Sequence, residues 1–140
     1  MQTLEEKKNN LIQQLSSIKN KDERLKFIID QGKALPVMDE KFKIDQFVVK
    51  GCISKAWLFP QFNEGRVKFH ADSEAMIVKG IIGILMKVYN DSTPDEILAE
   101  DGSFLAEVGV TEHLSMNRRN GLTNVLKMIK TYATAFKAQV

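Results

Sequence analysis

The sequence has only one cysteine, one tryptophan, two histidines and three prolines among its 140 residues. A single cysteine excludes an internal disulfide, and it also excludes a metal or iron–sulfur site built only from the cysteines of one chain. The charges nearly cancel, with 20 Lys and Arg against 18 Asp and Glu, so the total charge gives no reason to expect a nucleic-acid partner. One unpaired cysteine is consistent with a reducing compartment.

Segments that would predict export or a membrane span are also missing. Residues 1–8 carry acidic side chains and have no apolar core, so they are not a signal peptide. The most apolar run, residues 75–86, is interrupted by Lys79 and is too short to span a bilayer. We therefore expect a cytoplasmic protein without a membrane partner. The 140 residues, 44% hydrophobic and 27% charged, fit one globular domain over residues 1–140.

Common catalytic signatures are missing from the sequence as well. There is no glycine-rich phosphate loop, no dinucleotide-binding fingerprint and no serine nucleophile elbow. The two histidines, His70 and His113, do not fall at metal-ligand spacing from Cys52 or from each other, so a zinc site would need all three to converge with a carboxylate. A Cys–His nucleophilic pair would likewise need a partner from a distant part of the chain. We expect no metal and no cofactor, and a thiol that receives and passes on a group fits this sparse set of reactive residues.

The only cysteine and the only tryptophan lie in one segment, residues 49–57. Apolar residues flank it at 47–49 and 57–59. Two short β-prone runs joined by a few residues with a glycine predict a β-hairpin with Cys52 near its tip. Reactive side chains are often found on loops held by a rigid scaffold. Because proline cannot donate a hydrogen bond to a ladder, Pro60 is expected to end the second strand.

Two features of this segment favour a reactive thiol, and one alternative stays open. Lys50 and Lys55 bracket Cys52, and nearby cations favour the thiolate, which is the nucleophilic form. Gly51 allows a positive φ and a close approach by another backbone. The alternative is that Cys52 is a small buried hydrophobic residue with a structural role, as lone cysteines in intracellular proteins often are.

The remaining pattern predicts helices around a small sheet. Apolar periodicity, caps and turn residues indicate helices over 4–18 and 21–32, a third strand over 66–71, a central helix over 75–89, short helices after Thr93 and near 104–108, and a last helix after Ser115. The fold class is therefore α+β, with a small three-stranded antiparallel sheet packed against helices.

The central helix carries two further signals. Asp72 and Ser73 are expected to cap its start, with Glu74 in its first turn. Gly80 and Gly83 cost helix stability, so they are expected to let another element pack closely against it.

Arg118 and Arg119 lie in the first turn of the last helix, where arginine is unusual because that end of a helix already carries partial positive charge. One interpretation is a solvated face that costs a little stability. The other is a contact with an anion or a partner, or an ion pair with Asp72 or Glu74. Adjacent helical residues point about 100° apart, so the two arginines are not expected to share one role.

Four segments of the sequence form an ordered pattern. They are the glycine–cysteine segment Lys50–Leu58, the run Ala71–Gly80, Tyr89 followed by Thr93–Ile97, and His113–Ser115 followed by Arg118 and Gly121–Leu122. Together they resemble the SufE and CsdE family, whose members accept sulfur from cysteine desulfurases. The resemblance covers essentially the whole chain from the first helix onward, and the order of the four segments makes it specific.

The resemblance implies a SufE/IscU-like fold and a role in iron–sulfur cluster assembly. It implies that Cys52 accepts persulfide sulfur from a SufS- or CsdA-type desulfurase, stimulates that enzyme, and passes the sulfur to a SufBCD-type scaffold. The pyridoxal phosphate belongs to the desulfurase, so this chain would be a sulfur-transfer partner rather than an independent enzyme. By position, Gly51, Glu74, Arg118 and Arg119 are the candidates for contacts with the cysteine loop or the partner. A homodimer stays open.

The sequence departs from the family pattern at three places. Ile53 stands where many members have glutamine, Gln46 and Phe47 stand around the position of an asparagine, and Arg119 doubles the arginine. These departures concern the loop conformation and partner specificity rather than the role of Cys52.

Two other functions are compatible with a single cysteine in this segment. The chain could hold a nascent iron–sulfur cluster, although clusters usually take several thiolates and this chain offers one. It could instead be a non-catalytic interaction domain with a structural cysteine. If Cys52 carries sulfur, the apolar residues 57–59 beside the hairpin tip are expected to shield it.

Overall fold

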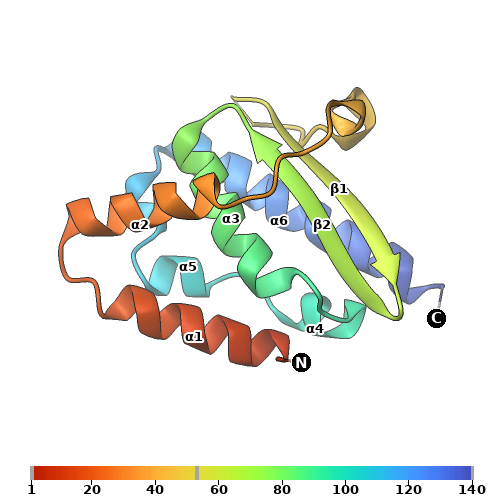
Figure 1. The fold of residues 1–140 in the computed structure, drawn as a ribbon, viewed down its shortest axis with the longest axis horizontal. Coiled ribbons are helices and arrows are strands. Elements are labelled where there is room, and N and C mark those ends of the chain that lie inside the picture. Colours follow the sequence, from red (N-terminus) through yellow and green to blue (C-terminus); the bar gives the residue numbers. More distant parts are fainter. Residues whose placement is uncertain (1, 53, 140) are drawn as a thin grey trace.

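The computed structural model describes residues 2–52 and 54–139, so Ile53, one of the departures from the family pattern, lies outside the described residues. The elements run in the order helices, β-hairpin, helices (Figure 1). The helices are α1 (Leu4–Ser16), α2 (Lys21–Lys33), α3 (Met76–Tyr89), α4 (Pro94–Ala99), α5 (Phe104–Glu107) and α6 (Met116–Lys137). The strands are β1 (Ala56–Asn63) and β2 (Arg66–Ser73), and short 3₁₀ turns are η1 (Glu40–Phe42), η2 (Asp45–Phe47) and η3 (Thr111–His113).

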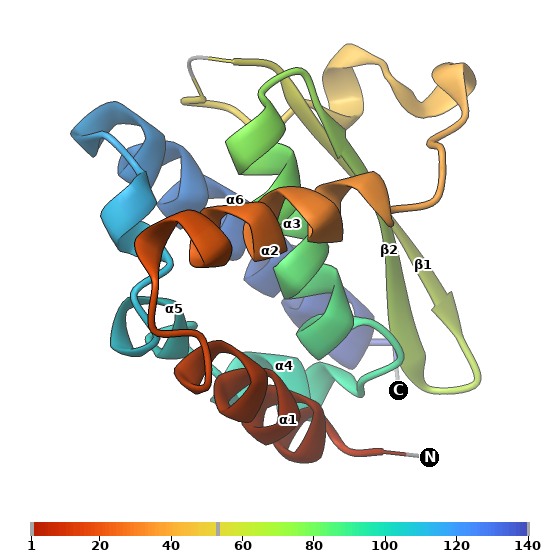
Figure 2. The same ribbon diagram turned by 60° about the vertical axis from the view of Figure 1, so that its left-hand side comes forward.

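The two strands form a ribbon along one side of the molecule, and α3 and α6 pack on its inner face (Figures 1 and 2). Alternate residues of β2, among them Val67, Phe69 and Ala71, are buried against these helices. The segment that carries η1 and η2 covers the outer face of the ribbon, where Phe42 stacks on Phe59 with ring centroids 4.0 Å apart. The α+β class is therefore confirmed.

The described part of the chain forms a sheet of two strands, not the three that the sequence predicted. The third predicted strand is present as β2, which pairs antiparallel with β1 from Ala56 opposite Ser73 to Asn63 opposite Arg66. The first predicted strand is reduced to one bridge between Val48 and Trp57. The reason lies just before it: η2 turns the chain, and Phe47 packs edge-on against Phe59, at 4.9 Å, instead of extending a ladder.

Pro60 does not end β1, contrary to expectation. It lies inside the strand, opposite Phe69. The backbone N–H of Phe69 donates to Asn90 Oδ1 at 2.8 Å, on the side away from β1, so Pro60 and Phe69 form a pair that exchanges no hydrogen bonds. The nitrogen of Pro60 therefore faces the free edge of the ribbon, where the ladder loses no donor.

Asp72 and Ser73 were predicted to cap the central helix, and this prediction is wrong. Both belong to β2, and α3 begins after Ala75, which makes no side-chain cap bond, so Glu74 also precedes the helix instead of lying in its first turn. The carboxylate of Asp72 instead pairs with Lys43 at 2.7 Å and with Lys79 at 3.2 Å. The N-terminal caps predicted for three other helices are present: Asn20 before α2, the Thr93–Glu96 capping box of α4 and Ser115 at the start of α6.

The close approach predicted at Gly80 and Gly83 is confirmed, and the element that approaches is α2. A Cβ on Gly80 would lie 2.7 Å from the carbonyl carbon of Ile28, and one on Gly83 would lie 2.7 Å from the carbonyl carbon of Gln31. Gly32, expected at the end of α2, lies within the helix and faces Gly80.

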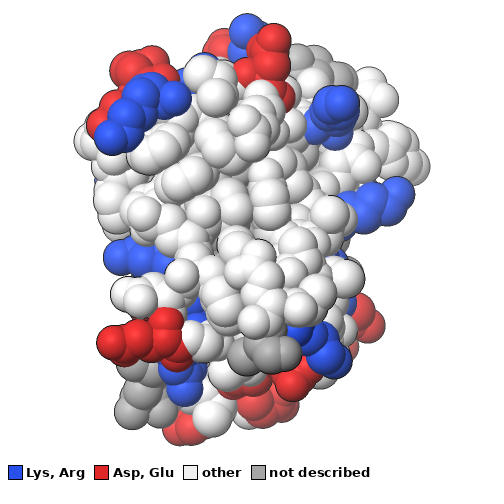
Figure 3. All heavy atoms as spheres, turned by 90° about the vertical axis from the view of Figure 1, so that its right-hand side faces the viewer, with Lys and Arg blue, Asp and Glu red and all other residues white. Residues whose placement is uncertain are grey.

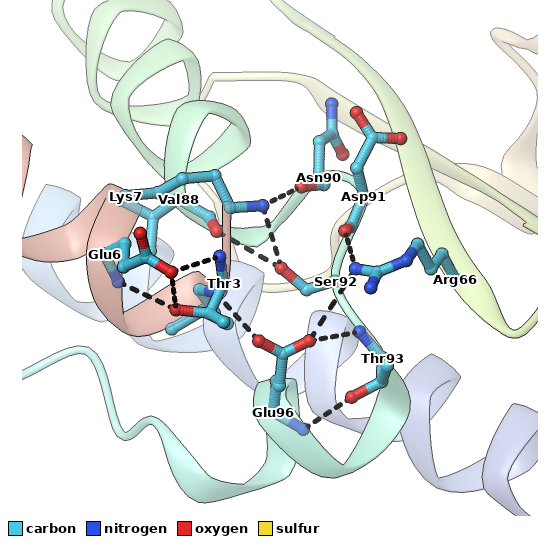
Figure 4. Close-up of polar contacts among 11 residues, drawn as sticks. Thr3, Glu6, Lys7, Arg66, Val88, Asn90, Asp91, Ser92, Thr93 and Glu96 are labelled. Carbon is cyan, nitrogen blue, oxygen red and sulfur yellow. Dashed lines mark hydrogen bonds and ion pairs between the residues drawn. The ribbon is translucent and has the colours of Figure 1, made fainter. Parts of the chain in front are cut away.

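A polar network ties the start of α1 to the turn between α3 and α4 (Figure 4). Glu96 accepts hydrogen bonds from the backbone N–H groups of Leu4, at 2.8 Å, and Thr93, at 3.0 Å. Lys7 donates to the carbonyl oxygen of Asn90 and to Ser92 Oγ, the latter at 3.1 Å. These bonds fix the end of the molecule where α1 begins and α4 lies, away from the segment that precedes β1 (Figure 1).

One face of the molecule carries few charges. Figure 3 shows this face, over β1 and the end of α6, with lysine, arginine and acidic side chains mostly near its margins. Strand β1 itself, AWLFPQFN, has no charged residue. In the described part of the chain, no helix is long and apolar enough to cross a bilayer.

Candidate functional site

The loop that carries Cys52 is held at both ends. At its start, the N–H of Val49 donates to the carbonyl oxygen of Ala56 at 2.8 Å. At its end, the carbonyl oxygen of Lys55 accepts from the N–H of Glu74 at 3.0 Å and from Ser73 Oγ at 3.1 Å. Cys52 therefore lies in a loop between two fixed points, beside the first residues of β1.

The thiol of Cys52 is half-buried and faces α6. It donates a weak hydrogen bond to the carbonyl oxygen of Gly121, with Sγ and oxygen 3.6 Å apart. Beside it is a small cavity of about 20 Å³, room for about one water-sized group. The lining is Cys52, Ser54, Val78, Ile81, Ile82, Leu114, Asn117, Arg118, Gly121, Leu122 and Val125, most of it apolar.

Burial raises the pKa of the Cys52 thiol above its usual range, which corrects the expectation that Lys50 and Lys55 would lower it. Both lysines are exposed, and neither lines the cavity. Transfer of a thiolate into apolar surroundings is unfavourable, so desolvation decides the protonation state in this conformation. The thiol is therefore held neutral and shielded.

Two glycines allow the loop to lie directly on α6. Gly51 has φ of +83°, a conformation that favours glycine, and a Cβ there would overlap Nδ2 of Asn124 and lie 3.3 Å from its Cγ. A Cβ on Gly121 would lie 3.0 Å from the Sγ of Cys52. Gly121 and Asn124 are three residues apart in α6, so they share one face of that helix.

Of the other predicted site residues Arg118, Arg119 and Glu74, only Arg118 lines the cavity beside Cys52. The side chain of Arg119 points elsewhere, and its Nε donates to the carbonyl oxygen of Thr111 at 3.1 Å. Glu74 is exposed and reaches the loop through its backbone N–H. Neither arginine pairs with Asp72, whose partners are lysines.

Residues 57–59 were expected to shield Cys52, but they do not line its cavity, and the shield comes from helices instead. Trp57 and Phe59 lie on the outer face of the ribbon, where Lys43 Nζ is 5.3 Å from the centre of the Trp57 ring and Phe42 stacks on Phe59. The apolar walls of the cavity are instead Val78, Ile81 and Ile82 from α3, and Leu122 and Val125 from α6. Helical periodicity could have found the α6 part, because residues 118, 121, 122 and 125 share one stripe.

His70 belongs to β2 and His113 to η3, so neither is on the loop that carries Cys52. His70 shares a hydrogen bond of 2.8 Å with Gln61 on the ribbon, and burial together with Lys68 lowers the pKa of His70. Burial and the nearby charge of Arg24 lower the pKa of His113. Neither lines the Cys52 cavity. Over residues 2–52 and 54–139, no three His, Cys, Asp or Glu side chains come together as a metal site.

Comparison with known proteins gives a consistent result. The family model described as SufE, Fe-S metabolism associated domain, matches residues 9–133. The cysteine desulfuration protein SufE of Wigglesworthia glossinidia brevipalpis is 33% identical over 129 residues, which are 91% of this chain and 90% of that protein. An uncharacterised SufE-like protein of Synechocystis sp. is 36% identical over 106 residues, 76% of this chain and 67% of that protein.

A solved structure shares the fold. The solution structure of a hypothetical protein from Thermus thermophilus aligns with a TM-score of 0.79, over 92% of this chain and 94% of that one. The identity is 18%, so this likeness concerns the architecture and not the chemistry.

Proposed function

Because the chain belongs to the SufE family, we propose that its only cysteine, Cys52, accepts sulfur from a cysteine desulfurase. In this proposal a SufS- or CsdA-type enzyme, which holds the pyridoxal phosphate, supplies the sulfur as a cysteine persulfide. Cys52 carries it, in the cytoplasm, to a SufBCD-type scaffold for iron–sulfur cluster assembly. The observation that carries the proposal is the position of this one thiol, on a loop over a small and mostly apolar cavity.

The transfer is an exchange between sulfur atoms. The thiolate of Cys52 attacks the terminal sulfur of the persulfide on the desulfurase cysteine. A new S–S bond forms to the Sγ of Cys52, the S–S bond to the desulfurase cysteine breaks, and that cysteine leaves as a thiolate. Cys52 gives up its proton before the attack, and the leaving thiolate is able to take one up. There is no net oxidation, so this chain needs no metal, cofactor or further acid.

The closed loop and the open loop have separate roles in this proposal. In the closed conformation the thiol is neutral and half-buried, so it is a poor nucleophile. Attack requires Cys52 to leave the cavity. Outside it, the neighbouring Lys50 and Lys55 would favour the thiolate. After transfer, a return of Cys52 to the cavity would keep water and reductants from the bound sulfur. Arg118, which lines the cavity, would lie beside the surface that contacts the desulfurase.

The test is a desulfurase assay with this protein as the acceptor. A SufS-type desulfurase from the same genome is mixed with cysteine and the chain, and sulfide release and the mass of the Cys52 peptide are measured. We expect faster turnover and one added sulfur atom on Cys52. Both should be lost in Cys52→Ser and Cys52→Ala, which have lost the thiol and should keep the fold. Stimulation that persists in both variants contradicts the proposal.

The half-buried thiol with its raised pKa also fits a second candidate, a non-catalytic interaction domain in which Cys52 only packs. The same variants separate the two functions. If the domain acts only by docking, Cys52→Ala stimulates the desulfurase as wild type does and no sulfur is found on the chain. Anaerobic reconstitution with iron and sulfide tests the scaffold function, which predicts cluster absorbance that disappears in Cys52→Ser.

A further inference from the structure

We propose that Gly121 and Asn124, three residues apart on α6, are positioning residues that set how often Cys52 leaves its cavity. The relevance of these two residues to sulfur transfer rests on the function proposed above. Their effect on how often Cys52 leaves the cavity does not depend on that function. The sequence pattern singled out Gly121 only as part of a family motif, and it did not single out Asn124.

Gly121 forms the floor on which the thiol lies. A Cβ at this position would be 3.0 Å from Sγ, 3.6 Å from the Cα of Cys52 and 3.7 Å from its Cβ. The last two distances are ordinary contacts, so the sulfur atom is the one that a side chain would disturb. The carbonyl oxygen of Gly121 also accepts the hydrogen bond from the thiol. The closed position of Cys52 therefore depends on a residue without a side chain.

The composition of α6 supports this assignment. Glycine inside a helix costs stability relative to alanine, so a buried glycine in the first half of a long helix needs a packing reason. Gly121 is buried, and its neighbour across the interface is Cys52. The thiol supplies the reason.

Asn124 lies against Gly51, the preceding residue of the same loop. Its side-chain amide lies over Gly51, so closely that a Cβ on Gly51 would overlap Nδ2. Gly51 and Cys52 thus rest on successive residues of one stripe of α6. Since the ends of the loop are fixed by the bond between Val49 and Ala56 and by the bonds to Lys55, opening is a local movement of Gly51 and Cys52 away from Asn124 and Gly121.

The experiment measures the rate at which iodoacetamide alkylates Cys52 in the folded protein over a range of pH. The proteins compared are wild type, Gly121→Ala and Gly121→Val, in which the side chain at position 121 becomes progressively larger. Alkylation requires the thiol to be outside its cavity and ionised. We expect about threefold to tenfold faster alkylation in Gly121→Ala, since overpacking of this size moves such equilibria by that order, and a larger effect in Gly121→Val. The pH midpoint of the reaction should fall along the same series, because an open thiol is no longer desolvated.

Asn120→Ala is the matched control, because Asn120 is exposed and precedes Gly121 in the same helix. It should alkylate at the wild-type rate. Asn124→Ala is the second variant, which removes atoms instead of adding them and so carries no risk of a clash. It should alkylate roughly two- to fivefold faster than wild type. Wild-type rates and midpoints in Gly121→Ala and Asn124→Ala would overturn the proposal.

A stability cycle checks that the effect passes through the sulfur. In a Cys52→Ala background the Sγ clash no longer exists, so Gly121→Ala should raise the urea midpoint, as alanine does in helices. With Cys52 present, the same change should raise it less or lower it. Equal effects in the two backgrounds would show that Gly121 does not act on the thiol. None of these measurements uses a desulfurase, so a failure of the proposed function leaves this outcome readable on its own.

Discussion

The contact between α2 and α3 leads to a prediction that can be worked out from distances. In Gly80→Ala, the new Cβ would lie 2.7 Å from the carbonyl carbon and 2.8 Å from the Cγ2 of Ile28. Ordinary contacts begin at 3.4 Å and the carbonyl oxygen of Ile28 lies closer still, so α2 would have to retreat by at least about 0.7 Å. A gap of that size removes roughly a quarter to a half of the dispersion attraction between facing atoms. The neighbouring contacts at Gly32 and Gly83 would be weakened as well.

The expected free energy combines two opposing effects. Overpacking a well-packed interface costs about 1–3 kcal/mol and occasionally more, and here the obstacle is backbone, which yields less than a side chain. Replacing glycine by alanine within a helix returns about 1 kcal/mol. We expect Gly80→Ala to lower the free energy of unfolding by about 2 kcal/mol, because movement of a whole helix places the first effect at or above its upper end.

Urea unfolding followed by circular dichroism and by the fluorescence of Trp57 would measure this change. The midpoint should fall by roughly 1 M at an unchanged slope. Gly65→Ala is the control, since no atom lies within 4 Å of a Cβ there, although Gly65, unlike Gly80, has a positive φ of +78°. Its loss reports backbone strain without a clash. A Gly80→Ala protein as stable as wild type would refute the close-packing argument.

Three further predictions concern the site and its pH dependence. Cys52 in the folded protein should be alkylated more slowly than in an unfolded peptide at the same pH, because burial raises its pKa, and equal rates would contradict shielding. Arg118→Ala, at the cavity, should weaken stimulation of the desulfurase by about tenfold, whereas Arg119→Ala should leave it near wild type, as titration of each variant against the enzyme would reveal. The pKa of His113 is lowered in the folded protein, so the neutral form is favoured there: its stabilising contribution is present above the unfolded pKa of about 6.5 and is lost as pH falls below it. Urea midpoints at pH 7.5 and 5.5 should therefore differ more in wild type than in His113→Asn, and an unchanged difference would exclude His113 as a cause.

Local signals predicted the helices well. The capping box at Thr93 and the Ser115 cap are complete within a few residues of sequence, and the structure has both. The apolar run that became α3 could be predicted to be a buried helix because nearly every position is apolar.

What the sequence did not predict depends on contacts between distant residues. Whether residues 47–49 form a strand depends on what covers Phe59, and Phe47 serves that purpose from a turn. The effect of Pro60 depends on which way the ladder bonds point, which only the pairing with Phe69 determines. The protonation state of Cys52 depends on burial next to Gly121, a residue 69 positions away. Lys50 and Lys55 are close to Cys52 in sequence, but they did not predict its protonation state correctly, because both are exposed to solvent.

The proline in β1 bears on how the protein behaves when it is crowded. An edge strand without charges is a template on which a neighbouring chain can add a strand of its own, and repeated addition leads to aggregates. Pro60 lies near the middle of this strand with its ring nitrogen toward the open side, so an incoming strand finds neither a donor nor room there. A single residue thus makes β1 a poor template for polymerisation, and the strand keeps its uncharged surface without the usual protecting lysines.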